Sequence, residues 1–553
     1  MQGLMQRTPL LLSSLITHAA RNHAGREIVG RSVEGPVVRT NWGEVEARAK
    51  RLANALARLG VREGERVATL AWNTQRHLEL YFGASGSGVV LHTINPRLFQ
   101  AQIEYMLEHA EDQYIFFDLS FAALVSALAP RIKGVRGYIA LTDRAHMPAI
   151  DLPNLLCYEE LLGSESAQFS WPDLDENAAS ILCYTSGTTG NPKGVLYSHR
   201  ALLLHSFCAA AADGAGLSCM DSVLTVVPLF HANAWGLPFA AAMCGAKLVF
   251  PGAELDGGSL FALARDEACN VVAGVPTVWF GFFDYIDRNR DKLDLGALHL
   301  DRALVGGSAA PRSLIARFDR DFGAFLLHAW GMTETSPIAT IGRLLPKHAG
   351  LDREARYDIQ AKQGRPVYGV EVRIVDDAGQ ELPRDGVAVG HLVVRGPWVT
   401  AGYFRGEGGV VVDAENWFDT GDVATIDSDG YVTLTDRAKD IIKSGGEWIS
   451  SIALENAAVG HADVLEAAVI GIPHPKWVER PLLLIRCKEG KVVSRQEMRD
   501  FLADKVARWW LPDDVIIVED LPHTATGKLS KATLRKLYAN HQIAPESAPA
   551  AAP

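Results

Sequence analysis

The sequence predicts an α/β protein with a large N-terminal domain of layered, mostly parallel sheets plus a small β unit, followed by an α+β C-terminal domain. Amphipathic helix patterns alternate with short apolar runs from residue 41 to about residue 330, which is typical of parallel sheets covered by helices. Near Val367 the apolar period shortens to two, which indicates antiparallel strands. Beyond the charged segment 435–440, further strand and helix patterns fill about a hundred residues, enough for a domain.

The first elements of the N-terminal domain follow from local signals. Thr8 and Pro9 form a helix-start signal, and the apolar residues of 12–19 share one helical face. A second helix is expected over 45–59 because its apolar residues also share a face, and 66–72 then has the pattern of a buried strand. The remaining elements expected in this domain are helices over 98–109 and 201–212 and strands over 114–117, 223–227, 370–374 and 391–394.

The C-terminal domain is expected to combine strands and helices. Its predicted strands cover 466–472, 482–488 and 515–518, and its predicted helices cover 495–508 and 530–540. The last residues, 542–553, are mostly Ala, Pro and Ser, a composition typical of a disordered tail.

Composition and charge exclude several classes of protein. A chain of 553 residues is too long for a single binding module or a small disulfide scaffold. The net charge of −11, without a long basic block, argues against nucleic-acid binding. Seven scattered cysteines without a C-x-x-C pair predict neither a disulfide framework nor a zinc site, and they fit the reducing cytoplasm. No apolar stretch reaches the length of about 20 residues that a transmembrane helix needs.

The strongest chemical motif is the segment 184–195, YTSGTTGNPKGV, which directly follows an apolar run. Its glycines, hydroxyl side chains and lysine can surround phosphate oxygens with backbone and side-chain donors. It is not a P-loop, because Lys193 follows Pro192 and precedes a glycine instead of Ser or Thr. The candidate phosphate-binding residues are Thr185, Ser186, Gly187, Thr188, Thr189, Gly190 and Lys193.

Together with four further motifs, this segment resembles the adenylate-forming superfamily of acyl-CoA synthetases, luciferases and adenylation domains. The motifs keep the family's order: WGMTE at 330–334, TGD at 420–422, DRAKD at 436–440 continuing to Gly446, and TGK at 526–528. The resemblance is strongest to medium- and long-chain fatty acyl-CoA synthetases and 3-methylmercaptopropionate:CoA ligases. It implies an N-terminal adenylation domain (1–436), a hinge (437–442) and a mobile C-terminal domain (443–541) before the tail.

The same resemblance implies a site for ATP and Mg²⁺. It assigns the metal to Glu334 with help from Thr185, and both supply the hard oxygen ligands that Mg²⁺ prefers. It stacks adenine on Trp330 and places the ribose hydroxyls on Asp422 and Arg437. The ATP- or AMP-binding residues implied beyond the phosphate loop are Gly307, Ser308, Ala309, Trp330, Gly331, Met332, Thr333, Asp422, Arg437 and Lys439.

Lys528 is a lone lysine in a predicted turn, where composition alone indicates a solvent-exposed side chain. The resemblance makes it the catalytic lysine that neutralises carboxylate and α-phosphate oxygens during adenylation. It also makes Lys439 the pivot about which the C-terminal domain turns after pyrophosphate leaves. That rotation would withdraw Lys528 and present a CoA-binding segment that contains Lys443, Gly445, Gly446 and Trp448.

The segment PLFHANAWG at 228–236 resembles the acyl-pocket segment of the family. His231 would border the carboxylate, either as a base or as part of the wall, and Trp235 would stand at the mouth of the acyl pocket. Gly306 and Gly331 would leave room for the acyl group. No acidic residue lies within 230–239 to pair with an ammonium group, so amino-acid substrates are disfavoured and an apolar acid is expected.

The sequence therefore predicts an ATP-dependent acid:CoA ligase that forms acyl-AMP and then acyl-CoA. Two alternatives within the superfamily are an acyl-AMP ligase that loads a carrier protein and a luciferase-like oxidation. A non-catalytic nucleotide-binding scaffold is the alternative from another class, and the presence of Lys528, Glu334 and Asp422 argues against it. The expected partners are a carboxylic acid, ATP and CoA, with no nucleic acid, and the resemblance to long-chain members implies a homodimer.

Overall fold

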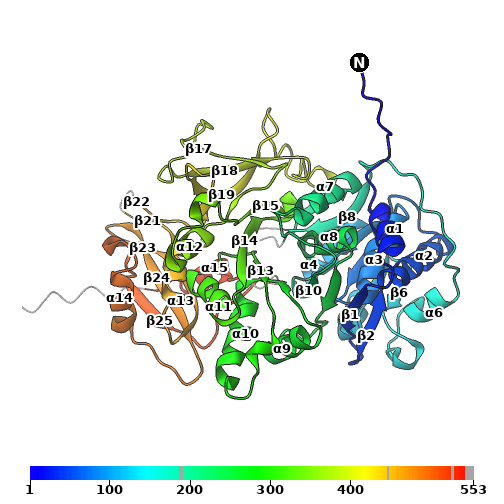
Figure 1. Ribbon diagram of the computed structural model, residues 1–553, viewed down its shortest axis with the longest axis horizontal. Helices are drawn as coiled ribbons and strands as arrows, with labels where there is room; N and C mark the ends of the chain where they lie inside the picture. Colours follow the sequence, from blue (N-terminus) through cyan, green and yellow to red (C-terminus); the bar gives the residue numbers. More distant parts are fainter. Residues whose placement is uncertain (186–190, 445–446, 525–527, 542–553) are drawn as a thin grey trace, which may run out of the picture.

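The computed structural model describes residues 1–185, 191–444, 447–524 and 528–541. It contains two large, mostly parallel sheets, a small antiparallel sheet and a C-terminal α+β unit, so the predicted α/β fold class is confirmed. In Figure 1 the N-terminal elements, in blue, and the C-terminal unit, in orange, lie at opposite ends of the molecule. Within the described ranges, no helix combines the length and the apolar character needed to cross a bilayer.

The first large sheet has the strand order β7-β6-β5-β3-β4-β8-β9. Its strands are β3 (Arg66–Leu70), β4 (Val90–Thr93), β5 (Asp112–Phe117), β6 (Gly137–Ala140), β7 (Leu155–Cys157), β8 (Ala179–Tyr184) and β9 (Gly194–Ser198). Neighbouring strands are parallel except for β8 and β9. The connection between these two strands is the predicted phosphate-binding segment, which therefore leaves the sheet at the carboxyl end of β8.

The second large sheet has the order β16-β15-β14-β13-β12-β10-β11-β1-β2. Its strands are β1 (Glu27–Arg31), β2 (Val37–Asn41), β10 (Ser222–Thr225), β11 (Lys247–Phe250), β12 (Val271–Gly274), β13 (Arg302–Val305), β14 (Phe325–Gly331), β15 (Ile338–Ile341) and β16 (Arg365–Pro366). The strands from β1 to β14 in this order run parallel. Apart from Lys247 at the start of β11, the four-residue strands β11 and β12 are apolar and buried, as expected where helices cover both faces of a sheet.

The helices begin and end where the sequence supplies caps. Asn41, Thr74 and Ser198 accept backbone hydrogen bonds at the starts of α2, α3 and α7. The first helix, α1, starts at Leu12, three residues beyond the predicted signal at Pro9, and its N-cap Leu11 makes no side-chain bond. The helices of the N-terminal region are α1 (Leu12–Asn22), α2 (Trp42–Arg58), α3 (Gln75–Gly86), α4 (Gln100–Ala110), α5 (Ala122–Leu128), α6 (Tyr158–Gly163), α7 (His199–Ala210), α8 (Leu237–Cys244), α9 (Gly257–Asp266), α10 (Pro276–Asn289), α11 (Arg312–Phe322) and α12 (Arg353–Gln360).

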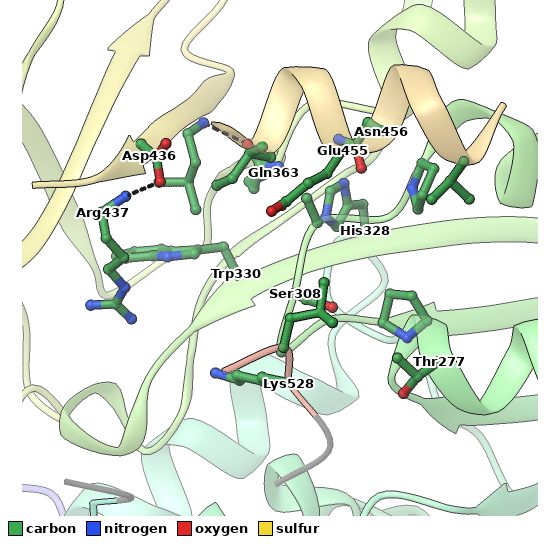
Figure 2. A pocket seen from close by; sticks show the side chains of 18 of the residues that line it. Thr277, Ser308, His328, Trp330, Gln363, Asp436, Arg437, Glu455, Asn456 and Lys528 are labelled. Atoms are coloured by element: carbon green, nitrogen blue, oxygen red, sulfur yellow. Dashed lines mark hydrogen bonds between the residues drawn. The ribbon is translucent and has the colours of Figure 1, made fainter. Parts of the chain in front are cut away.

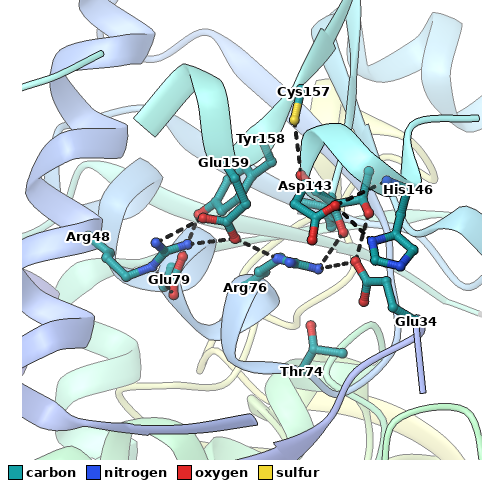
Figure 3. A network of polar contacts seen from close by, with 12 residues as sticks. Glu34, Arg48, Thr74, Arg76, Glu79, Asp143, His146, Cys157, Tyr158 and Glu159 are labelled. Atoms are coloured by element: carbon teal, nitrogen blue, oxygen red, sulfur yellow. Dashed lines mark hydrogen bonds and ion pairs between the residues drawn. The ribbon is translucent and has the colours of Figure 1, made fainter. Parts of the chain in front are cut away.

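A network of ion pairs ties the N-terminal helices together (Figure 3). Arg48 of α2 pairs with Glu79 of α3 at 2.7 Å and with Glu159 of α6 at 3.0 Å. Arg76 of α3 pairs with the same Glu159 at 2.8 Å and with Glu34, between β1 and β2, at 2.7 Å. Because each arginine bridges two elements, the network fixes α2, α3 and α6 against the β1–β2 connection.

The small β unit is an antiparallel sheet with the order β17-β18-β19-β20. Its strands are β17 (Glu371–Val375), β18 (Gly390–Arg395), β19 (Phe418–Ile426) and β20 (Val432–Arg437). Figure 1 shows this unit, in yellow, along one edge of the molecule between the two ends. Its last strand leads directly into the segment predicted as the hinge.

The C-terminal unit has a sheet of its own with the order β22-β21-β24-β23, and β25 pairs with β24. Its elements are β21 (Ile442–Ser444), β22 (Glu447–Ile449), α13 (Ser451–Val459), β23 (Val464–His474), β24 (Val478–Cys487), α14 (Arg495–Ala503), β25 (Asp514–Ile517) and α15 (Lys531–Leu537). Leu454, Val469, Leu483 and Met498 form part of a core that is separate from the N-terminal cores. The predicted helix over 495–508 ends at Ala503, and Arg508–Trp510 form a separate short 3-10 turn.

Candidate active site

A central cavity opens where the carboxyl ends of strands from both large sheets meet the C-terminal unit. We define the central cavity by Thr185, His231, Trp235, Glu334 and Lys528, which all line it. Thr185 follows β8, and Glu334 lies in the turn after β14. Loops at the carboxyl ends of parallel strands are the common position of ligand sites in α/β sheets. An adjoining cavity, shown in Figure 2, shares Trp330 and Lys528 with the central one.

Asp422, Trp330 and Arg437 form a hydrogen-bonded group between the two cavities. The Trp330 Nε1–H donates to Asp422 Oδ2 at 3.0 Å, and Arg437 Nε lies 2.7 Å from Asp422 Oδ1. Strand register brings Asp422 and Arg437 together, because Asp422 of β19 stands opposite Arg437 of β20. Burial raises the pKa of Asp422, and the positive charge of Arg437 opposes that shift. Each carboxylate oxygen keeps a second lone pair for a ligand hydroxyl.

The described ends of the phosphate-binding segment are held together. Thr185 N–H donates to the carbonyl oxygen of Lys193 at 2.9 Å, and the Lys193 N–H donates to Thr185 Oγ1 at 3.1 Å. The ring of Tyr403 lies against the Lys193 ammonium, 4.8 Å from nitrogen to ring centroid. Ser186, Gly187, Thr188, Thr189 and Gly190, the other candidates in this segment, lie outside the described residues.

Glu334 faces the cavity from a buried position, 6% exposed. Its Oε1 accepts a hydrogen bond of 2.7 Å from the Tyr403 hydroxyl, and its carbonyl oxygen accepts one of 2.7 Å from the Thr400 N–H. Burial and the nearby negative charge of Glu334 raise the pKa of Tyr403. Thr333 also lines the cavity, and its carbonyl oxygen accepts a 2.7 Å bond from the Tyr197 hydroxyl.

The carboxylate of Glu334 and the hydroxyl of Thr185 are therefore available to a magnesium ion in the same cavity. Among the described residues, no three His, Cys, Asp or Glu side chains gather as a metal-binding group. Mg²⁺ does not require such a group, because it keeps several waters and binds through one or two carboxylates together with substrate phosphates. The donor set of Thr185 and Glu334 thus fits magnesium held jointly with a phosphate ligand.

Lys528 reaches the cavity from the C-terminal unit. A Cβ built on Gly307 would lie 3.8 Å from Lys528 Cε, so the two segments are close. Figure 2 shows Lys528 on the same side of the adjoining cavity as Ser308. Burial and the positive charge of Arg437 lower the pKa of Lys528 to about 8, whereas Asp422 and Glu334 act in the opposite direction. The solvent-exposed lysine that composition indicates is therefore not found; Lys528 lies at the junction of the two units.

His231 lines the central cavity together with Lys528, whose charge acts on it. Burial, with a contribution from the Lys528 charge, lowers the pKa of His231 to about 3. The imidazole is neutral at pH 7, and a group with so low a pKa is a poor general base. The side chain can still donate or accept one hydrogen bond, which favours a role in the wall over proton abstraction.

Trp235 lies in a left-handed turn along the cavity, which continues to Gly236. The φ angles of Ala232, Asn233, Ala234 and Trp235 are 43°, 55°, 46° and 58°. Non-glycine residues occupy this region at a cost of about 1–2 kcal/mol each, and such strain is found mostly at functional sites. The turn directs the indole toward Gly306, where a built Cβ would lie 3.5 Å from the Trp235 ring.

The glycines of the cavity are required by neighbouring backbone. A Cβ on Gly306 would lie 2.7 Å from the carbonyl oxygen of Ala329, and one on Gly331 would lie 1.8 Å from that of Pro337. Both residues line the central cavity, and these carbonyls occupy the space that a side chain at either position would need. Gly307, Ser308, Ala309 and Met332 also line one or both cavities.

The predicted hinge and CoA-binding residues are only partly at the site. Lys439 lines the central cavity, and burial lowers its pKa. Lys443 lies on β21 with an exposed side chain and lines neither cavity. Gly445 and Gly446 lie outside the described residues, as does the side chain of Trp448.

Sequence reasoning missed three functional candidates. Tyr403 stands in a glycine-rich segment, where a single tyrosine carries no distinguishing pattern. Glu455 and Lys531 face the adjoining cavity and pair at 2.9 Å. Burial raises the pKa of Glu455 to about 7, and the Lys531 charge opposes that shift. The sequence does not predict that Glu455 and Lys531 form an ion pair, because 76 residues separate them along the chain.

Comparisons with known proteins agree with this geometry. The AMP-binding enzyme family model matches residues 16–404, and the AMP-binding enzyme C-terminal domain model matches 453–528. The 3-methylmercaptopropionyl-CoA ligase of Ruegeria lacuscaerulensis is 49% identical over 535 residues, which cover 97% of this chain and 98% of that protein. The medium-chain-fatty-acid–CoA ligase of Ectopseudomonas oleovorans is 47% identical, with coverage of 97% and 98%.

Solved structures show the same fold. The structure of the anthranilate CoA ligase AuaEII in complex with anthranoyl-AMP has a TM-score of 0.85 at 23% identity and covers 97% of this chain and 99% of its own. A benzoate CoA ligase from Burkholderia xenovorans has a TM-score of 0.80 at 26% identity, with coverage of 95% and 99%. The resemblance inferred from the motifs is confirmed: with a family model over most of its length and relatives near half identical over nearly all of it, the chain belongs to the AMP-binding enzyme family.

Proposed function

We propose that the protein is an ATP-dependent acid:CoA ligase that works in two half-reactions. In the first, the carboxylate attacks the α-phosphorus of ATP, forming acyl-AMP and releasing pyrophosphate. In the second, the CoA thiolate attacks the acyl carbonyl and AMP leaves. The observation that carries the proposal is that Lys528, Thr185 and Glu334, which come from distant parts of the chain, line one cavity.

Each half-reaction needs its negative charges neutralised. In the first half-reaction, Lys528 lines the same cavity as His231 and Glu334, and its ammonium could bind carboxylate and α-phosphate oxygens as charge develops. We assign the ribose to Asp422 and Arg437 and the adenine to Trp330. Magnesium, when bound, would offset phosphate charge, and Thr185 and Glu334 are the residues that would hold it.

The second half-reaction requires a different placement of the C-terminal unit. Lys443 lies outside the cavities while Lys528 lies inside, so the arrangement described here suits adenylation. We propose that residues 443–541 form a mobile domain that turns about a hinge at 437–442, relative to an adenylation domain of 1–436. After rotation, Lys443, Gly445, Gly446 and Trp448 would border the thiol.

The acid is proposed to be apolar and uncharged apart from its carboxylate. Ala232, Trp235 and Ile338 give the central cavity an apolar wall. The 3-methylmercaptopropionyl-CoA and medium-chain-fatty-acid–CoA ligases named above support a short thioether acid or a fatty acid, and thus a role in lipid or organosulfur metabolism.

The free cysteines of the described residues fit the cytoplasm, and the resemblance to long-chain synthetases supports a homodimer.

A panel of carboxylic acids tests the proposed function. Acids from C2 to C18, aryl acids and methylthio acids are incubated with ATP, Mg²⁺ and CoA, and AMP release is measured. We expect turnover with at least one apolar acid that requires both acid and CoA. Transfer to a holo carrier protein in place of CoA, an oxidised product, or no acid-dependent AMP would each contradict the proposal.

Shrinking Trp235 is expected to change acid preference. Because its indole forms part of the cavity wall beside Gly306, Trp235→Ala leaves apolar space, and the preferred chain length in the same panel should increase. A methylene in an apolar pocket changes kcat/KM by about 10- to 200-fold. The control is Trp279→Phe, because Trp279 is a buried tryptophan on α10 that lines neither cavity. An unchanged acid profile in Trp235→Ala would remove this residue from the acyl pocket.

A further inference from the structure

Tyr403 contacts two groups that the proposed function places around the phosphates. Its hydroxyl donates to Glu334 Oε1 at 2.7 Å, and its ring centroid lies 4.8 Å from the Lys193 ammonium. We propose that Tyr403 is a positioning residue that sets the spacing between the carboxylate that holds magnesium and the lysine that binds phosphate. The inference rests on the proposed function, since it gives roles to Glu334 and Lys193.

The chemistry of the two contacts suits that role. A phenol hydroxyl orients the carboxylate through one oxygen, so Glu334 Oε2 and the remaining lone pair of Oε1 can face a cation. The π face attracts the Lys193 ammonium without carrying a formal charge, so the ammonium keeps its full charge for phosphate. Among the described residues, no carboxylate forms an ion pair with Lys193, and its ammonium lies against the Tyr403 ring and near Gly408.

The segment that carries Tyr403 is itself held in place. Arg405 pairs with Glu111 at 2.6 Å, and Glu407 accepts a 2.6 Å hydrogen bond from the Tyr105 hydroxyl of α4. The Thr400 N–H donates to the carbonyl oxygen of Glu334, so the backbone before Tyr403 also contacts the metal-ligand residue. These contacts fix the tyrosine from both sides, as expected of a group that determines a distance instead of adapting to one.

Two substitutions separate the contacts. Tyr403→Phe removes the hydroxyl and keeps the ring, whereas Tyr403→Leu removes both. We measure the binding of Mg·ATP and of AMP by isothermal titration calorimetry, because AMP has neither the β- nor the γ-phosphate. We expect Tyr403→Phe to weaken Mg·ATP binding by about 10- to 100-fold, the range for a hydrogen bond to a charged group. Tyr403→Leu should weaken it by about a further 3- to 30-fold through the lost cation–π contact.

AMP binding by both variants should stay close to that of the wild type, a result that a merely structural role would not give. The concentration of Mg²⁺ that half-saturates pyrophosphate exchange should rise in Tyr403→Phe. Tyr357 supplies a matched control, because its hydroxyl donates to Asp319, the Arg312 guanidinium lies 5.5 Å from its ring, and it lines neither cavity. Tyr357→Phe and Tyr357→Leu should bind Mg·ATP as the wild type does.

The outcomes of these measurements decide whether Tyr403 has the proposed positioning role. Unchanged Mg·ATP binding in Tyr403→Phe, or an equal loss for Mg·ATP and AMP, overturns the inference. If Tyr403→Leu fails to fold, the phenylalanine variant still carries the test. A wild-type protein that binds Mg·ATP but releases no acid-dependent pyrophosphate would instead contradict the proposed function, so the two failures are distinguishable.

Discussion

Replacing Lys528 by alanine is expected to slow acyl-AMP formation by about 10²- to 10³-fold, the usual effect of removing a donor aimed at developing charge. The ammonium faces Glu334 and His231 inside the central cavity, where a carboxylate and an α-phosphate would otherwise repel each other. The measurement is acid-dependent pyrophosphate exchange. Thioester formation from supplied acyl-AMP and CoA should remain nearly unchanged, because the proposed rotation would remove Lys528 from the cavity before that step.

The control for this substitution is Lys536→Ala, which removes an exposed lysine of α15 in the same unit. It should leave both half-reactions at the wild-type rate. Equal losses of adenylation and thioester formation in Lys528→Ala would contradict the two-arrangement scheme, because a lysine outside the cavity cannot assist the second step. A small loss in adenylation would contradict the charge-neutralising role.

Much of the N-terminal fold could be predicted because its elements carry strong local patterns. The buried strand at 66–72 is observed as Arg66–Leu70, and the helix at 45–59 as Trp42–Arg58. Asn41 caps that helix, which a pattern of apolar residues alone places three residues late. At 495–508 the predicted helix was too long: the Lys505 and Val506 N–H groups both bond to the carbonyl of Leu502 as the helix ends.

The site could be predicted only where several residues form a motif. Trp330, Asp422 and Lys528 belong to such motifs, and all three line the cavities. Tyr403 could not be found in this way, because its partners lie 69 and 210 residues away along the chain. The backbone requirement for glycine at position 331 could not be predicted for a similar reason, because the close approach of the Pro337 carbonyl depends on how two strands pair.

The contact between the two units depends on a buried cluster of charges. Asp436, at the end of β20, accepts hydrogen bonds from the backbone and hydroxyl of Ser451 at the start of α13. Lys531 donates to the same hydroxyl and pairs with Glu455 at 2.9 Å, with side chains only 11% and 13% exposed. Figure 2 shows Asp436 and Glu455 facing the adjoining cavity, with α13 along its edge. Lys531 is thus the cation that compensates buried carboxylates where the units meet.

Lys531→Met is therefore expected to destabilise the protein by about 3–5 kcal/mol, the cost of leaving a buried charge without its partner. Urea unfolding measures the loss, and adenylation should fall more than thioester formation because the arrangement with Lys528 in the cavity loses its contact. The double variant Lys531→Met with Glu455→Gln, which removes both charges of that pair, should recover part of the stability, because Asp436 still lacks the compensating charge of Lys531.

The pH dependence of Lys531→Met gives an independent check with a defined sign. Burial raises the pKa of Glu455 to about 7 from its ordinary 4.5 even with Lys531 present, and removing the lysine should raise it further. A carboxyl whose pKa is higher in the folded state contributes stability at low pH and loses that contribution as the pH rises through its folded pKa. The deficit of Lys531→Met relative to the wild type should hence stay constant below about pH 7, where Glu455 is protonated in both proteins, and deepen as the pH rises above 7. The double variant should show a smaller change, carried by Asp436. A deficit independent of pH would show that Lys531 contributes through packing and not through its charge.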